Sequence, residues 1–199
     1  MSKLVDYYLT LNSPWAYLGS ARFAEIAKRH GAEVRVKPAN FGEVFPRTGG
    51  LPLPKRAPER QAYRLVELQR WRDFLGIPIN LKPAHFPAQE GLAARMVIAA
   101  GDSGGHPLEL AHAFGKAVWE QERDFGDPAT CEAIAGETGH DGAKLRAAAE
   151  DPALEKRHAE LTEEAIARGV FGSPSYVYKD EIFWGQDRLE FLDRALAKG

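Results

Sequence analysis

The strand-like segments of this sequence lie near its two ends. Near the N-terminus, Leu4–Leu11 (LVDYYLTL) alternates apolar and polar residues and is rich in β-forming side chains, which predicts a strand. The next segment, Pro14–Gly31, repeats large apolar residues at helical spacing and ends at a glycine. A second short strand is predicted at Glu33–Pro38 (EVRVKP). A strand, a helix and a strand in this order predict two parallel strands joined by a right-handed crossover.

The residues that follow carry helical patterns almost as far as Gly169, after a loop rich in Pro and Gly. The helices predicted there are Glu59–Leu75, Ala88–Ala100, Pro107–Arg123, Pro128–Glu137, Gly142–Ala149 and Pro152–Arg168. The period then changes again, because Ser173–Tyr178 and Glu181–Gly185 predict an antiparallel hairpin and Gln186–Lys198 predicts a closing helix. The whole order predicts a split α/β domain that is interrupted by an all-helical insertion, with a sheet of two parallel and two antiparallel strands.

Composition and charge exclude several classes of partner and site. With 26 basic and 28 acidic residues the formal net charge is −2, so neither nucleic acid nor an anionic membrane surface is expected as a partner. The first residues show no basic region followed by an apolar run, and no apolar stretch approaches the ~20 residues of a membrane helix. The 6 histidines are scattered without the spacing of metal ligands, so no metal site is predicted. We therefore expect a soluble, cytoplasmic protein.

The turn between the first strand and the first helix carries a serine followed by a proline. Ser13 is predicted to cap the helix and Pro14 to be its first residue, where a missing N–H costs nothing. A helix N-terminus also offers free N–H donors and a partial positive charge, which favour a bound anion. The chain has 1 cysteine, Cys131, which we expect to be a buried structural thiol. From the residues alone, Ser13 is either a helix cap or a group placed for chemistry.

Three segments together resemble a known family. The segments NSPWAYLG (residues 12–19), LQRW…GIPI (68–79) and GVFGSPSY…FWGQDRL (169–189) are similar to the 2-hydroxychromene-2-carboxylate isomerases, which are glutathione-dependent relatives of kappa-class glutathione transferases. The resemblance spans nearly the whole chain and implies the thioredoxin fold of DsbA-type proteins. It implies a thioredoxin-like domain at residues 1–44 and 169–199, with the helical insertion at residues 45–168.

The resemblance implies that glutathione is the cofactor and that Ser13 holds its sulfur. Redox members of the superfamily carry Cys-x-x-Cys where this chain has Ser-Pro-Trp-Ala, so dithiol exchange is excluded. Ser13 matches the family's serine that binds the glutathione sulfur and favours the thiolate, which is the nucleophile. Pro174 matches the family's cis-proline, beside which the backbone of Ser173 would pair with the cysteinyl part of glutathione. The other implied glutathione contacts are Leu53, Pro54, Trp184, Gly185, Gln186 and Asp187.

Two of these implied glutathione contacts keep open alternatives. Asp187 either caps the closing helix or accepts the ammonium group of the γ-glutamyl end. Gln186 stands where the family often has Asn, so the resemblance implies a contact through its backbone more firmly than through its longer side chain.

The helical insertion is implied to form the opposite wall of the site, against the organic substrate. The residues that match positions near the substrate are Lys37, Phe45, Tyr63, Arg70 and His85. For each basic residue among them, a solvated surface position is the competing interpretation. A carboxylate substrate would favour one or two cations in such a pocket.

The implied activity is cis–trans isomerisation of aromatic enone carboxylates of the 2-hydroxychromene-2-carboxylate type, by reversible addition of the glutathione thiolate. Such a reaction belongs to the catabolism of aromatic hydrocarbons. Two alternatives stay open: a kappa-class-like glutathione transferase or peroxidase, which consumes glutathione, and a non-catalytic DsbA-like module that binds peptides or thiols. Members of the family are often dimers, so a homodimer is compatible with the resemblance.

Overall fold

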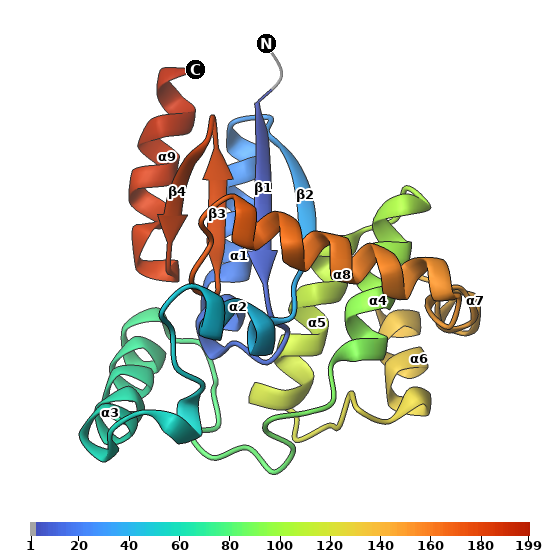
Figure 1. Cartoon of the computed structure of the whole chain (residues 1–199), viewed down its shortest axis with the longest axis horizontal. Helices are drawn as coiled ribbons and strands as arrows, with labels where there is room; N and C mark the ends of the chain where they lie inside the picture. The colour runs from blue at the N-terminus through green and yellow to red at the C-terminus, as the bar shows by residue number, and fades with distance from the viewer. Residues whose placement is uncertain (1–2) are drawn as a thin grey trace.

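The computed structural model describes residues 3–199 and has a four-stranded sheet surrounded by helices (Figure 1). The strands are β1 (Leu4–Leu9), β2 (Glu33–Pro38), β3 (Ser175–Tyr178) and β4 (Glu181–Trp184), in the order β2-β1-β3-β4. Strands β1 and β2 are parallel, and β3 runs antiparallel to both of its neighbours. The predicted sheet and its strand directions are therefore confirmed.

The helices follow the predicted segments, although the helix predicted at Pro107–Arg123 already ends at Trp119 and two other elements differ. The helices are α1 (Pro14–Arg29), α2 (Phe41–Arg47), α3 (Pro58–Leu75), α4 (Gly91–Asp102), α5 (Pro107–Trp119), α6 (Pro128–Glu137), α7 (Gly142–Ala149), α8 (Pro152–Ala167) and α9 (Leu189–Lys198), with the 3-10 turns η1 (Leu53–Lys55) and η2 (Gln186–Arg188). Helix α2 was not predicted, because it is one of the shortest and contains Pro46. The predicted closing helix begins instead as the separate turn η2, and α9 follows it.

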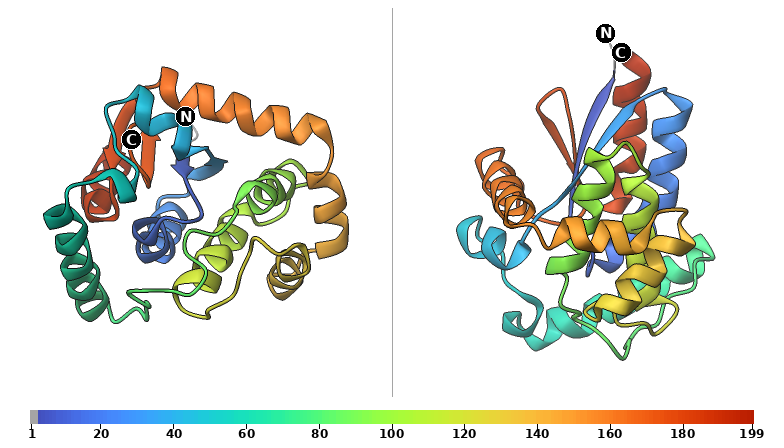
Figure 2. Two further views of the ribbon diagram at one scale, coloured as in Figure 1. Left: turned by 60° about the horizontal axis from the view of Figure 1, so that its bottom comes forward. Right: turned by 90° about the vertical axis from the view of Figure 1, so that its right-hand side faces the viewer.

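Different helices cover the two faces of the sheet, which Figure 2 shows edge-on in its right-hand view. Successive side chains of β1 point to opposite faces, as in any strand. Val5, Tyr7 and Leu9 pack in the larger core cluster with α1 and α9, and that cluster continues into helices α4 to α7. Tyr8 packs in the smaller cluster with α2 and α8. The sheet and the helical block thus share one core, and the predicted division into two domains stays a prediction.

Some of the predicted glutathione contacts, in the Ser13 turn, the Ser173–Pro174 segment and Trp184–Gly185, lie together at one end of the sheet. Strand β1 ends there and leads into α1, β3 begins there, and β4 ends there, because β3 is antiparallel to both neighbours. Helix α3 lies across from this end of the sheet (Figure 1). Of all the residues of α3, only Leu68 is fully buried, so this helix is attached to the molecule along a narrow face. Within residues 3–199, none of the helices has both the length and the apolar character to cross a membrane.

Candidate functional site

Ser13 is the N-cap of α1 and is nearly buried, with 6% of its surface exposed. Its Oγ accepts a hydrogen bond from the backbone N of Ala16 at 3.2 Å, and Pro14 is the first helical residue. The capping role predicted from the sequence is therefore present. The same hydroxyl donates to the backbone oxygen of Ser173 at 3.2 Å. Ser13 thus joins the start of α1 to the segment that precedes β3.

The Ser173–Pro174 peptide bond is cis, as the resemblance implied. The Ser173 Oγ accepts a hydrogen bond from the backbone N of Thr10 at 3.1 Å. On the other side, the backbone N of Gly185 donates to the Pro174 oxygen at 2.8 Å. These hydrogen bonds connect the Ser13 turn, the cis-proline and the end of the β3–β4 hairpin to one another.

Trp184 lies beside the cis-proline with 43% of its surface exposed. Its ring packs against the edge of the half-exposed Phe171, with 4.9 Å between the ring centroids. A Cβ atom on residue 172 would overlap this indole, so Gly172 allows the ring to lie against the backbone. Gly185 has a φ of 94°, which favours glycine and turns the chain from β4 into η2. The predicted contacts Trp184 and Gly185 therefore border the site.

The next two predicted contacts differ from each other in their exposure. The side chain of Gln186 is buried, and its Oε1 accepts a hydrogen bond from the guanidinium of Arg22, whose Nη2 also donates to the Gln186 backbone oxygen at 3.1 Å. This side chain is already hydrogen-bonded within the chain, and a contact of Gln186 with glutathione, which the resemblance implies more firmly for its backbone, stays a prediction. Asp187 is exposed, and its carboxylate pairs with Arg188.

Leu53 and Pro54 lie in η1, between α2 and α3. Leu53 is half-buried and Pro54 is exposed. The backbone oxygen of Leu53 accepts a hydrogen bond from the backbone N of Arg56 at 3.1 Å, which closes the η1 turn. A role for these two residues as a cover over glutathione stays a prediction.

The carboxylate of Glu90 holds the turn that precedes Ser13, which the sequence analysis did not detect. One of its oxygens accepts hydrogen bonds from the backbone N of Leu11 at 2.7 Å and of Asn12 at 3.3 Å. The Thr10 hydroxyl donates to the same carboxylate at 2.6 Å. Burial raises the pKa of Glu90, although these hydrogen bonds favour its charged form. A single glutamate in the first turn of the predicted helix Ala88–Ala100 carries no sequence signal for such a role.

Asn12 attaches the loop at residues 84–90 to the same turn. Its Nδ2 donates to the backbone oxygen of Ala88 at 3.0 Å, and its Oδ1 accepts from the backbone N of Ala88 at 2.9 Å. This loop contains a second cis-proline, Pro87, which the sequence did not predict. The loop therefore runs beside the residue next to Ser13.

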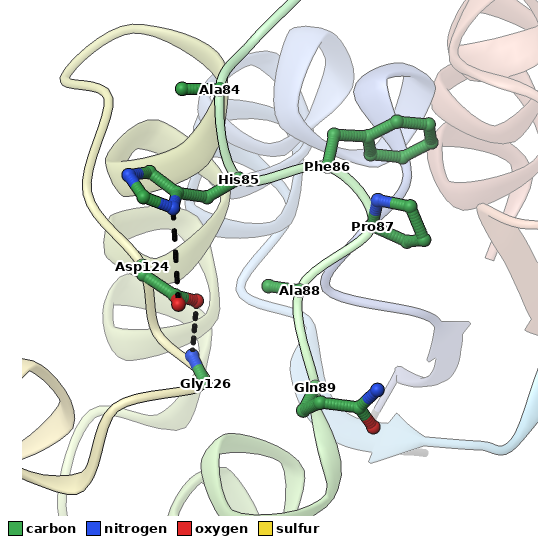
Figure 3. A pocket seen from close by; sticks show the side chains of 8 residues that line it. All are labelled: Ala84, His85, Phe86, Pro87, Ala88, Gln89, Asp124 and Gly126. Atoms are coloured by element: carbon green, nitrogen blue, oxygen red, sulfur yellow. Dashed lines mark hydrogen bonds and ion pairs between the residues drawn. The ribbon is translucent and has the colours of Figure 1, made fainter.

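The same loop borders a cavity of about 240 Å³, shown in Figure 3. His85 and Asp124 line one side of it and Gln89 the other. The His85 Nδ1 lies 3.8 Å from an Asp124 oxygen, which is too long for a hydrogen bond. Of the predicted substrate residues, His85 lines this cavity. Ala88 also lines it, and its hydrogen bonds to Asn12 connect the cavity wall to the Ser13 turn.

Lys37 is held by ion pairs within the chain. It is buried, and its Nζ forms ion pairs with Asp6 at 2.9 Å and with Glu164 of α8 at 2.6 Å. Both partners belong to the side of the sheet that α8 covers. The charge of Lys37 is already neutralised inside the chain, which gives this residue a structural role, and its contact with a substrate stays a prediction.

The remaining predicted substrate residues lie on α2 and α3. Phe45 packs edge-on against Phe41, with 5.5 Å between the ring centroids. Tyr63 is 57% exposed, and Arg70 forms an exposed ion pair with Glu67 at 2.9 Å. The shared helix face of Tyr63 and Arg70 is present as predicted, but it faces solvent. Contact of either residue with a substrate stays a prediction that the structure does not favour.

The chain's own thiol is unsuited to nucleophilic chemistry. Cys131 is buried and donates a hydrogen bond to the backbone oxygen of Phe125 at 3.0 Å. Burial, together with nearby carboxylates, raises the pKa of this thiol to about 12. The prediction of a buried structural cysteine is confirmed. Among residues 3–199 no cluster of His, Cys, Asp and Glu side chains is suited to hold a metal ion.

Comparison with known proteins identifies the family. The family model described as the DSBA-like thioredoxin domain matches residues 4–197. A 2-hydroxychromene-2-carboxylate isomerase from Pseudomonas putida is 30% identical over 199 residues, which cover 98% of this chain and 95% of that protein. The chain belongs to the DSBA-like thioredoxin family. Within this family, its similarity to the isomerases confirms the resemblance seen in the three sequence segments.

Solved structures of DSBA-like proteins agree with this assignment. The structure of a 2-hydroxychromene-2-carboxylate isomerase superposes with a TM-score of 0.85 at 26% identity, covering 98% of this chain and 95% of that chain. A probable DsbA oxidoreductase from Streptomyces coelicolor shares the fold, with a TM-score of 0.78 at 20% identity and coverage of 98% and 89%. The DSBA-like thioredoxin fold predicted from the sequence is therefore confirmed.

Proposed function

We propose that this chain is a glutathione-dependent cis–trans isomerase of aromatic enone carboxylates of the 2-hydroxychromene-2-carboxylate type. The observation that carries the proposal is the position of the Ser13 hydroxyl, at the N-terminus of a helix of 16 residues and 3.2 Å from the Ser173 oxygen. The names of the most similar relatives support the class of reaction. The dependence on glutathione is supported by the chemistry of the turn and by the buried, protonated state of Cys131.

The residues around Ser13 suit a bound thiolate. At 3.2 Å its hydrogen bond to the Ser173 oxygen is long for an O–H donor, so the hydroxyl loses little by turning to a charged acceptor. The first turn of α1 adds N–H groups and a partial positive charge. One hydrogen bond to an anion contributes ~1.5–3 kcal/mol, which corresponds to a thiol pKa lower by roughly one or two units.

When bound, glutathione would supply a thiolate that adds reversibly to an unsaturated carbon, so that the former double bond can rotate before the thiolate leaves. The residues of the chain would position the bound glutathione and stabilise the negative charge of its thiolate. Ser13 stabilises the thiolate before addition and after release, and Glu90 fixes the turn that carries Ser13. The exposed aromatic pair of Trp184 and Phe171 offers an apolar border beside the cis-proline. No net redox change and no metal ion enters this scheme.

An isomerase assay tests the proposal. The absorbance change of 2-hydroxychromene-2-carboxylate is followed with and without glutathione for the unsubstituted protein, Ser13→Ala and Ser103→Ala. Ser103 is a matched control, because its hydroxyl bonds to a backbone oxygen at the far end of α4. We expect turnover only with glutathione, and a kcat/KM for Ser13→Ala that is lower by about tenfold to a hundredfold.

Four results would contradict parts of the proposal. Equal turnover without glutathione would show that glutathione is not the cofactor. Full activity of Ser13→Ala would show that the Ser13 hydroxyl has no role in the reaction. Accumulation of a stable glutathione conjugate would assign a transferase instead, and an absence of both turnover and glutathione binding would favour the non-catalytic module.

A further inference from the structure

Three arginines at four-residue spacing follow one side of α3 and the turn before it. Arg56 lies at the end of η1, and Arg60 and Arg64 lie in the first two turns of α3. Within residues 3–199 these three form no ion pair with a carboxylate, whereas Arg70 and Arg72 of the same helix are both paired. Like charges at this spacing repel one another. An anion bound beside them would relieve that repulsion.

Arg64 is the most enclosed of the three by aromatic rings. Its guanidinium lies over the ring of Phe86 at 5.5 Å and over the ring of Trp119 at 5.6 Å. The two rings also pack on each other, with 4.8 Å between their centroids. The two rings attract and hold the guanidinium through their faces, and its N–H donors can still bond to an acceptor. Burial and the nearby Arg56 lower the pKa of Arg64 to about 10, so it keeps its charge at neutral pH.

Contacts along the chain connect Arg64 to the Ser13 turn. Phe86 precedes Ala88 by two residues, and Ala88 exchanges two hydrogen bonds with the side chain of Asn12, the neighbour of Ser13. The Phe86 ring, over which the guanidinium lies, points away from the side chain of His85 in Figure 3. Helix α3 itself lies across from the end of the sheet that carries Ser13 (Figure 1).

We infer that Arg64 binds the carboxylate of the organic substrate. A planar guanidinium matches a carboxylate with two parallel hydrogen bonds, and the aromatic surroundings exclude water from that pair. The other basic candidates are less suited, because Lys37 is held by two carboxylates and Arg70 is paired with Glu67. The inference rests on the proposed function, because that function identifies the substrate. Binding of a carboxylate by Arg64 does not itself depend on that function.

Two measurements on Arg64→Gln, Arg64→Lys and Arg72→Gln test this inference. The first is the KM for the carboxylate substrate and, separately, the KM for glutathione. The second needs no turnover: the Kd of salicylate, and of the neutral salicylamide, by isothermal titration calorimetry. Arg72 is the matched control, because it lies on the same helix and pairs with its neighbour Asp73. Thermal unfolding of each variant checks that it is folded.

We expect Arg64→Gln to raise both the substrate KM and the salicylate Kd by about tenfold to a hundredfold, with an unchanged KM for glutathione. Arg64→Lys should recover part of the loss, and Arg72→Gln should behave like the unsubstituted protein. Salicylamide should bind weakly to all of them.

Unchanged substrate KM and salicylate Kd in a folded Arg64→Gln variant would overturn the inference. A rise in the KM for glutathione alone would also overturn it, because the arginine would then serve a glutathione carboxylate. If the unsubstituted protein has no isomerase activity, the proposed function fails, while loss of salicylate binding in Arg64→Gln would still support a carboxylate site at Arg64.

Discussion

Glu90 is the residue on which the position of Ser13 depends most directly. The donors around its buried carboxylate are the hydroxyl of Thr10 and the backbone N–H groups of Leu11 and Asn12. All three donors reach the same carboxylate oxygen, so a glutamine can place its Oε1 there, but its NH₂ group then replaces the second oxygen, which is also within reach of the Thr10 hydroxyl, and the donors lose that acceptor. We therefore expect Glu90→Gln to lower the free energy of unfolding in urea by ~1–3 kcal/mol at pH 7. The exposed Glu155→Gln is the matched control and should have little effect.

The stability difference between the unsubstituted protein and Glu90→Gln should also depend on pH. Burial raises the pKa of Glu90 in the folded state, so the folded protein holds this proton at pH values where the unfolded chain has lost it. The stability that this protonation provides is complete below the ordinary pKa of about 4.3 and is lost as the pH rises through the folded value. The free energy of unfolding of the unsubstituted protein should therefore exceed that of Glu90→Gln by less and less as the pH rises. An advantage that grows over this range would contradict the prediction.

Residues whose role depends on a local turn were predictable, and residues whose partners lie far along the chain were not. Ser13 caps α1 because of the two or three residues around it, and the family motif located Pro174. The partners of Lys37 are on β1 and α8, and no local pattern reveals them. No local pattern indicates the surroundings of Arg64 either, because the rings beside it lie 22 and 55 residues further along the chain.

At the level of elements, the contact between α6 and α7 requires a glycine at the start of α7. A Cβ atom on residue 142 would overlap the backbone oxygen of Glu132 in α6, so Gly142 lets the two helices approach. Gly136 of α6 has open space around it and no positive φ. We expect Gly142→Ala to lower the free energy of unfolding by ~1–3 kcal/mol and Gly136→Ala to raise it by ~0.5–1 kcal/mol.

Chemical denaturation of both glycine variants tests this prediction, with circular dichroism as the probe. The two substitutions add the same methyl group one helix apart, so they separate the effect of close packing from the effect of helix propensity. A stabilising Gly142→Ala would show that α7 can move away from α6 without loss.

Elements were predictable where the hydrophobic period extends over several turns. The long helices α1, α3 and α8 and all four strands were found close to their observed ends. Helix α2 was missed, because it has only 7 residues and carries Pro46, and its N-cap at Asn40 follows directly after β2. The start of η2 was taken as helix, because a positive φ at Gly185 cannot be read from the helical pattern of the residues after it.

At the scale of the whole molecule, the sheet and the helical block are joined by one core, so they should unfold together. Two half-buried histidines lie where the elements meet. His112 of α5 stacks on Tyr17 of α1 at 5.6 Å and shares a 2.6 Å hydrogen bond with Ser20. His158 of α8 has a buried Nε2 with no hydrogen-bond partner among the residues that the structure describes. Burial lowers the pKa of both imidazoles.

Acid should therefore destabilise the whole molecule through these two residues. The unfolded chain takes up protons near pH 6.5, whereas the folded protein resists protonation of both histidines until the pH reaches their lower folded pKa values. The free energy of unfolding keeps the full contribution of the two neutral histidines above pH 6.5. Below that pH it should fall by at most ~1.4 kcal/mol per pH unit for each histidine. Urea unfolding between pH 7 and pH 5 measures this slope. We expect the slope to be flatter in His112→Gln and His158→Gln and unchanged in the exposed control His106→Gln.

Because a shared core makes unfolding a single transition, probes of the sheet and of the helices should give the same midpoint at every pH. Two separate midpoints would instead support independent domains.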